Sequence, residues 1–287
     1  MGLRPLDIMT AVICWFDKSD RHCWPWAVAD SRFSHFQDSQ QILLDQGAKI
    51  YSFPLVIRKT WGFGEVTHFT NVGIAFAGST LVAQNTMLCI SSICGNLVYE
   101  RNAGEALSLE HVANLTARLA ERFMRSLAVL READAGAEFA IIGWCYATLR
   151  WRIFHLSPIV QDGLHIQVRE FIAENEEDLL LLGDSKDRVK QEVRQVRAGY
   201  TSNTLRWWRG PVEAMSRLLV QREIDSIGGY LQMGIAVEAT KSFNLSAIVQ
   251  PIAYGQPEST FKFLGMDTRE DIGPIGPCFI GMSGMVT

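Results

Sequence analysis

Thr10 is the residue of this sequence with the clearest capacity for covalent chemistry. It follows Met9 and begins the apolar, strand-like run at residues 10–16. If the chain before it is removed, or was never made, Thr10 carries both a hydroxyl and a free α-amine. Nucleophile and base then belong to one residue, which is the N-terminal threonine form of nucleophilic catalysis. The alternative is an ordinary buried strand threonine, and Met-Thr alone does not separate the two.

The composition narrows the class of protein around Thr10. The 287 residues are 48% hydrophobic and 20% charged, which is typical of a globular protein with one large domain or two small ones. A net charge of −4 argues against nucleic-acid binding, and scattered histidines argue against a metal site. No Walker-type or GxGxxG loop is present, so we expect no cofactor.

The six cysteines include no CxxC pair, and several lie in apolar runs. We therefore expect free thiols, a reducing compartment and a cytoplasmic location. No apolar run reaches the roughly 18–20 residues that a membrane span needs, so no membrane partner is expected.

Strands and helices alternate in blocks along the chain. Strands are expected at residues 10–16, 22–29, 47–53, 72–77, 139–146, 151–156, 164–171, 179–182, 230–238 and 245–253. Helices are expected at residues 79–97, 108–133, 186–198 and 211–222. This order predicts an α+β fold, a four-layer αββα sandwich of two antiparallel sheets flanked by helix pairs. Pro25 predicts an edge position or a bulge for the second strand, and the Gly- and Pro-rich tail after Gly255 is expected to form a loop.

Short motifs follow Thr10 in a fixed order. They are Met9-Thr10-Ala11-Val12, Ala29-Asp30-Ser31-Arg32, Gly47-Ala48-Lys49-Ile50-Tyr51 and Gly73-Ile74-Ala75-Phe76-Ala77-Gly78-Ser79-Thr80. Two weaker ones come later, Gly183-Asp184-Ser185-Lys186 and Asp225-Ser226-Ile227-Gly228-Gly229. The ordered set covers about residues 10–240 and resembles the proteasome β-subunit family of N-terminal-nucleophile hydrolases, with its bacterial HslV and Anbu relatives.

The resemblance implies a catalytic role for several of these residues. Thr10 Oγ would attack an amide carbonyl and pass its proton to the α-amine. Lys49 would lower the pKa of the hydroxyl through its positive charge, and Asp30 would hold Lys49 charged and oriented. The backbone N–H of Gly78 would bind the oxyanion. Support for the α-amine and the proton path would come from Ser185, Asp225 and Ser226.

The resemblance also implies a substrate and an assembly. Phe76, Ser79 and Thr80 would line the substrate site, and Phe76 would shorten its pocket, so we expect cleavage after small residues. The implied function is a threonine-type peptidase of peptides or unfolded proteins, built as a homo-oligomeric ring or helix. A separate ATPase unfoldase would be its partner.

Residues 10–254 would form the hydrolase domain and residues 255–287 a C-terminal extension. Self-cleaving family members carry glycine before the threonine, whereas this chain has Met9. We therefore expect residues 1–9 to be a trimmed leader or a misannotated start.

Several alternatives remain open. The protein could be a catalytically inactive assembly protein that keeps its leader, or a non-peptide amidohydrolase or acylase. Asp30 and Lys49 could form an ordinary surface pair, and Gly78 could be a simple strand-to-helix turn. Ser185 could act only as a helix N-cap, with Asp225 and Ser226 as loop residues.

Overall fold

The computed structural model describes residues 11–19, 23–36, 40–59, 64–99, 106–129, 135–160, 164–251, 258–275, 277 and 280. They belong to two compact units. The first contains Tyr51–Leu180 and Ala236–Asn244, and the second contains Met9–Ile50, Leu181–Ile235 and Leu245–Thr287. Thr10, the expected leader and Cys278 lie outside the described residues.

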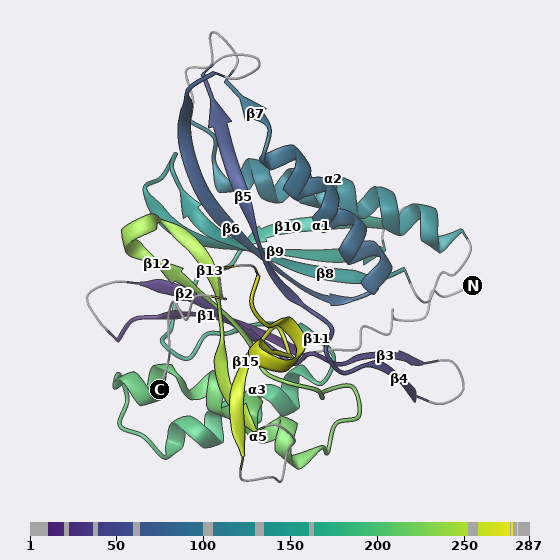
Figure 1. Ribbon diagram of the computed structural model, residues 1–287, viewed down its shortest axis with the longest axis vertical. Coiled ribbons are helices and arrows are strands. Elements are labelled where there is room, and N and C mark those ends of the chain that lie inside the picture. Colours follow the sequence, from purple (N-terminus) through teal and green to yellow (C-terminus); the bar gives the residue numbers. More distant parts are fainter. Residues whose placement is uncertain are drawn as a thin grey trace. The chain divides into compact units, whose positions relative to one another are not determined.

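A six-stranded sheet forms the first unit, in the order β10-β9-β8-β6-β5-β7 (Figure 1). Neighbours from β10 to β6 run antiparallel, whereas β7 joins β5 in parallel. Two helices, α1 and α2, pack on each other and on this sheet. Ser108 caps α2 with a reciprocal capping box whose other member is His111. The bounds are β5 Ile50–Arg58, β6 Val66–Gly78, α1 Thr80–Cys94, β7 Leu97–Val98, α2 Leu109–Ala128, β8 Ala137–Cys145, β9 Arg150–Val160 and β10 Leu164–Glu170.

A five-stranded sheet, in the order β11-β1-β2-β12-β13, organises the second unit. Helices α3 and α5 pack together, and α5 contacts β2. The chain passes between the units within β12 and β13. The bounds are β1 Ala11–Asp17, β2 Trp24–Ala29, β11 Leu180–Gly183, α3 Lys186–Ala198, α4 Leu205–Trp208, α5 Gly210–Gln221, β12 Gln232–Val237 and β13 Ser242–Ser246. A 3₁₀ turn, Glu238–Thr240, connects the last two.

The α+β class is confirmed, and the opening hairpin is present as β1 and β2. The edge position that Pro25 predicts is wrong, because β2 lies between β1 and β12. The register with β12 ends at the Ile235–Trp26 pair. Pro25 therefore lies beyond this ladder, where a missing backbone donor is tolerated.

Two segments that lie outside the expected strands contain strands. Residues after Ala29 form the hairpin β3 (Phe33–Phe36) and β4 (Gln40–Leu44). The tail after Gly255 forms β15 (Ser259–Phe263) and β16 (Met266–Asp267), which join β14 (Ile248–Pro251) in a three-stranded sheet. A π-helical turn, Thr268–Ile272, follows. These strands are too short for a clear alternating pattern, which explains the error.

Each unit has a buried apolar centre. In the first it includes Ile74, Phe76 and Phe139, and in the second Ile13 and Trp208. The free thiols expected from the sequence are confirmed at Cys14, Cys23, Cys89, Cys94 and Cys145. None of the described helices combines the length and apolar character of a membrane span.

Candidate active site

Asp30 is the centre of a hydrogen-bond network at the end of β2. Its side chain is fully buried, and Oδ1 accepts bonds from Lys49 Nζ at 2.8 Å and from the Ala11 backbone N–H at 3.2 Å. Oδ2 accepts bonds from the backbone N–H groups of Arg32 and Gly228, both at 3.1 Å. Four donors thus fix one carboxylate, which is how a buried charge is stabilised.

Lys49 is buried to the same degree as Asp30, so the surface-pair alternative is wrong. Burial lowers the pKa of the Lys49 ammonium from its ordinary value, while the charge and hydrogen bond of Asp30 oppose this shift. Asp184 also raises the pKa and Arg32 lowers it. Asp30 therefore stabilises the charged form of Lys49 against the effect of burial.

Ser226 and Asp184 form a second polar pair in the same unit. The Ser226 hydroxyl lies 2.8 Å and 3.0 Å from the two carboxylate oxygens of Asp184. Asp225, by contrast, has an exposed side chain, and only its backbone carbonyl accepts a bond from Arg32, at 3.3 Å. Ser226 is therefore hydrogen-bonded to Asp184, and the negative charge of Asp184 also raises the pKa of Lys49.

Ser185 occupies the N-cap position of α3 but makes no side-chain capping bond. Its backbone is left-handed, with φ of 53°. A non-glycine residue in this region carries strain of about 1–3 kcal/mol, and such strain is common at functional sites. The simple capping alternative is therefore not supported.

Gly78 ends β6 in the first unit, one residue before the N-cap of α1. Its φ is 101°, and a Cβ atom would lie 2.4 Å from the carbonyl oxygen of Gly136. Only glycine fits this turn. Ser79 is the N-cap residue, Thr80 begins α1, and Phe76 is 1% exposed between Tyr51 and Phe139.

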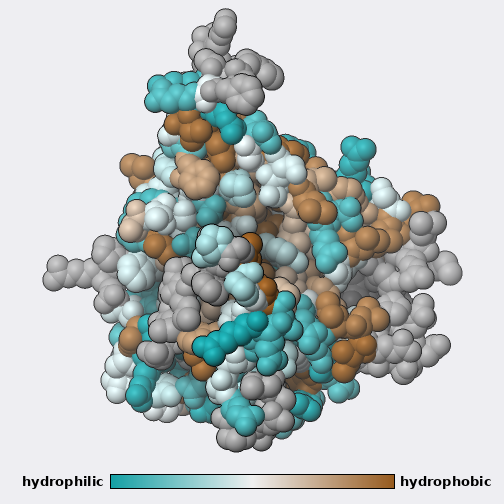
Figure 2. All heavy atoms as spheres, in the orientation of Figure 1, coloured by the Kyte–Doolittle hydropathy of each residue, from teal (hydrophilic) through white to brown (hydrophobic). Residues whose placement is uncertain are grey.

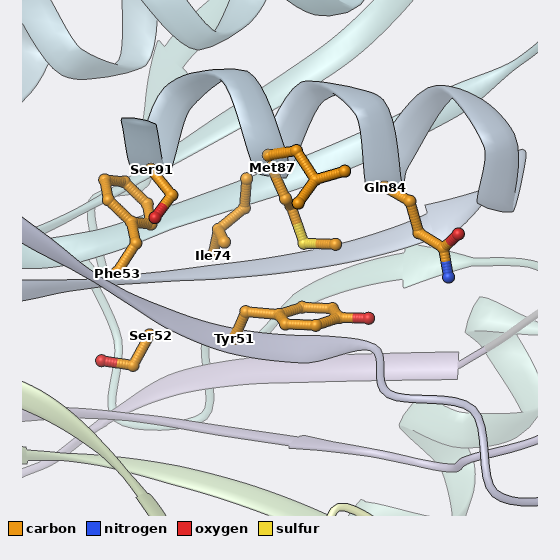
Figure 3. Close-up of a pocket in the computed structure, with 8 residues that line it drawn as sticks. Tyr51, Ser52, Phe53, Ile74, Gln84, Met87 and Ser91 are labelled. Atoms are coloured by element: carbon orange, nitrogen blue, oxygen red, sulfur yellow. The ribbon is translucent and has the colours of Figure 1, made fainter. Parts of the chain in front are cut away.

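A cavity of about 330 Å³ lies beside α1 in the same unit. Figure 3 shows Met87 and Gln84 extending from α1 toward the Tyr51 ring on β5. Burial raises the pKa of Tyr51 to about 12, so its phenol stays neutral. The cavity offers mainly apolar surface to a ligand, and no sequence motif indicated it.

Solved structures with a similar fold include Anbu proteins from three bacteria. Anbu (ancestral beta-subunit) from Yersinia bercovieri is 16% identical with a TM-score of 0.52, over 79% of this chain and 81% of that one. The helical assembly of the Anbu complex from Pseudomonas aeruginosa is 14% identical with a TM-score of 0.53, over 82% of this chain and 85% of that one. Anbu from Hyphomicrobium sp. strain MC1 is 14% identical with a TM-score of 0.51, over 90% of this chain and 88% of that one.

The fold is similar to that of Anbu. At these identities the likeness concerns the fold alone. No protein-family profile matches the sequence, and no curated protein matches it.

Within this Anbu-like fold, sequence reasoning missed three residues around Lys49. Asp184 belongs to the motif Gly183-Asp184-Ser185-Lys186, in which the resemblance implies a role for Ser185 alone. Ser31 and Gln232 are fully buried and bonded to the loops around Asp30. A polar Gln232 in the apolar run 230–238 was the available signal, since buried polar groups need partners.

Replacement of Asp30 by alanine is expected to destabilise the protein by about 3–5 kcal/mol, because it leaves a buried ammonium uncompensated. Three backbone N–H groups lose their acceptor as well. Equilibrium unfolding in urea measures the loss. Asp45→Ala is the control, since its carboxylate is 37% exposed in its pair with Arg32 and should cost under about 1 kcal/mol. Equal losses in both variants would contradict the central role of Asp30.

Proposed function

We propose that this protein is a threonine-type hydrolase that cleaves peptide amide bonds with Thr10 as its N-terminal nucleophile. One observation carries the proposal. The backbone N–H of Ala11 and the Nζ of Lys49 both bind Oδ1 of Asp30. Ala11 is joined directly to Thr10, so this shared oxygen ties the start of β1 to a buried lysine of lowered pKa.

The reaction follows from these groups. Thr10 Oγ adds to the carbonyl carbon, and its proton passes to the α-amine under the influence of Lys49. The oxyanion that forms would be bound by the Gly78 N–H. Collapse breaks the C–N bond, the amine departs with the proton, and water then hydrolyses the ester on Thr10. Ser226, held by Asp184, and the strained Ser185 would support the α-amine during these transfers.

We further infer that copies of the chain assemble with one another. The Pseudomonas aeruginosa Anbu complex is a helical assembly. Hydrophobic residues gather in several patches on the face drawn in Figure 2. On α1, Leu81 and Leu88 are 59% and 69% exposed, and exposed apolar side chains of this kind favour self-association. Size-exclusion chromatography with light scattering measures the assembly, and a monomer at working concentration would contradict it.

Peptides or unfolded proteins are the proposed substrates, delivered by a separate ATPase unfoldase. Phe76 is 1% exposed and packed between two other aromatic rings, so the expected preference for cleavage after small residues rests on the sequence resemblance alone. A panel of fluorogenic peptides measures this preference. Fastest cleavage after Leu or Phe would instead point to the apolar cavity beside α1.

Two measurements on the native protein test the proposal. N-terminal sequencing should begin at Thr10, and a peptide epoxyketone should add one mass equivalent to the chain by bonding to both the hydroxyl and the amine. A chain that begins before Thr10 leaves the amine acylated, and the proposal then fails in favour of an inactive assembly protein. A free Thr10 that reacts with simple amides but not peptides would indicate an amidohydrolase.

A further inference from the structure

Gln232 holds the backbone segment that carries Lys49. It is fully buried at the start of β12, and its Oε1 accepts bonds from the backbone N–H groups of Lys49 at 2.8 Å and Ile50 at 3.4 Å. Its Nε2 donates to the carbonyl oxygen of Gly47 at 2.6 Å. The Gln232 side chain therefore supplies both an acceptor and a donor to the backbone around Lys49, as a neighbouring strand would.

The C-terminal extension reaches the same place. Gln232 Nε2 also lies 3.5 Å from the carbonyl oxygen of Leu264. Leu264 and Gly265 form the turn between β15 and β16, with φ of 53° and 86°. A Cβ atom on Gly265 would lie 3.2 Å from Ser31 Oγ and 3.4 Å from Gln46 Cα. The turn thus packs directly on the two segments that contain Asp30 and Lys49.

Ser31 links these segments to each other. Its hydroxyl donates to the carbonyl oxygen of Asp45 and accepts the Tyr230 N–H at 2.7 Å. Its carbonyl oxygen accepts the Gly47 N–H at 2.8 Å. Displacement of Ser31 would therefore move both the residue after Asp30 and the approach to Lys49.

The three-stranded sheet that contains this hairpin is also attached to the unit beyond the turn. Gln250 on β14 exchanges two bonds with the backbone of Leu231, at 2.7 Å and 2.8 Å. Lys262 on β15 is 5% exposed, and its Nζ lies 4.0 Å from the centroid of the Tyr230 ring. The three-stranded sheet is thus connected to both residues that precede Gln232.

We propose that the C-terminal hairpin β15–β16 and Gln232 together position Lys49 for catalysis, so that Gln232 is a positioning residue and the extension completes the active site. This inference rests on the proposed function. It assigns the segment after residue 255 a task inside its own subunit. Because reacting groups tolerate little misplacement, the extension should affect turnover without touching substrate.

Two glycines of the extension provide a matched test. Gly265→Ala and Gly273→Ala both place a side chain at positive φ, 86° and 65°. Gly273 has ψ of −167°, in a region open almost only to glycine, so its variant controls for the effect of backbone strain alone. Only the Gly265 variant presses on Ser31 and Gln46, since the nearest atom to a Cβ at Gly273 is Arg269 O at 3.6 Å. We expect Gly265→Ala to lower kcat about tenfold with KM little changed, and Gly273→Ala to leave both unchanged.

Hydrogen exchange and a pH profile provide readouts that distinguish positioning from general stability. The Lys49 and Ile50 amides should exchange about tenfold faster in Gly265→Ala than in Gly273→Ala, because their acceptor Gln232 is displaced. The pH dependence of kcat should shift in Gly265→Ala alone, since Lys49 senses Asp30, Asp184 and Arg32 through this geometry. Gln232→Leu should reproduce both changes.

Unchanged exchange at Lys49 and Ile50 in Gly265→Ala would overturn the inference whatever the activity. Faster exchange with an unaltered kcat and pH profile would overturn it too. An inactive wild-type protein would defeat the proposed function, and the positioning of Lys49 for catalysis with it. The two failures remain distinguishable, because the hydrogen-exchange comparison needs no turnover. It still shows whether Gln232 and the β15–β16 turn hold the backbone of Lys49.

Discussion

Replacement of Thr10 by alanine is expected to abolish peptide cleavage, by roughly 10⁴-fold or more, and to prevent the epoxyketone adduct. The loss is large because one substitution removes the attacking oxygen itself. The fold should survive, since Ala11 keeps its bond to Asp30 and its place on β1. Fluorogenic peptide hydrolysis and intact mass spectrometry measure the two effects.

Thr10→Ser is the matched control for this experiment. Serine keeps both a hydroxyl and an α-amine, so it should retain adduct formation and measurable turnover. An adduct on Thr10→Ala would show that another residue is the nucleophile. In that case the bonds of Asp30 Oδ1 to Ala11 and Lys49 would serve only to hold β1 in place.

Replacement of Lys49 by methionine is expected to reduce cleavage by about 10²- to 10⁴-fold while the protein stays folded. Methionine fills a similar volume in the buried site but carries no charge to assist proton transfer. Asp30 keeps three backbone donors, so its carboxylate remains stabilised and the stability loss should be smaller than that of Asp30→Ala. Steady-state kinetics and urea unfolding measure both.

The pH dependence of stability gives a second readout for Lys49. Its folded-state pKa is lowered, so between that value and the ordinary lysine pKa of about 10.4 the unfolded chain binds more protons. The stability of the wild-type protein relative to Lys49→Met should therefore rise as pH increases across this window. Lys59→Met is the control, because Lys59 and its partner Glu65 are 60% and 72% exposed. Loss of activity in both variants would argue against a specific role for Lys49.

The burial of the Asp30–Lys49 pair shows what spacing along a chain leaves undetermined. Short motifs named both residues, and their chemistry suggested a pair, but a surface ion pair has the same residue types. Only the folded unit shows that both side chains have no solvent exposure and that one oxygen serves Lys49 and Ala11 together. These contacts join residues far apart in sequence, which local patterns do not encode.

Some helices and strands were predictable from local sequence, and others depend on partners elsewhere in the fold. Long periodic segments such as α2, and the hairpin of β1 and β2, were predictable because their apolar spacing and caps are local properties. The short strands β3, β4, β15 and β16 were not, because two- to five-residue strands depend on partners rather than on pattern. Pro25 in a central strand is explained only by where the ladder with β12 ends.

The sequence by itself determined the α+β class and the candidate nucleophile Thr10, because apolar spacing and residue type are local properties. Tertiary structure decided that Asp184, rather than Asp225, holds Ser226, and that Gln232 and the Leu264–Gly265 turn support Lys49. The physical reason is that a buried polar group must be satisfied by whatever the fold brings near it. Residue types indicate which reactive groups are present, and packing decides which of these groups contact one another.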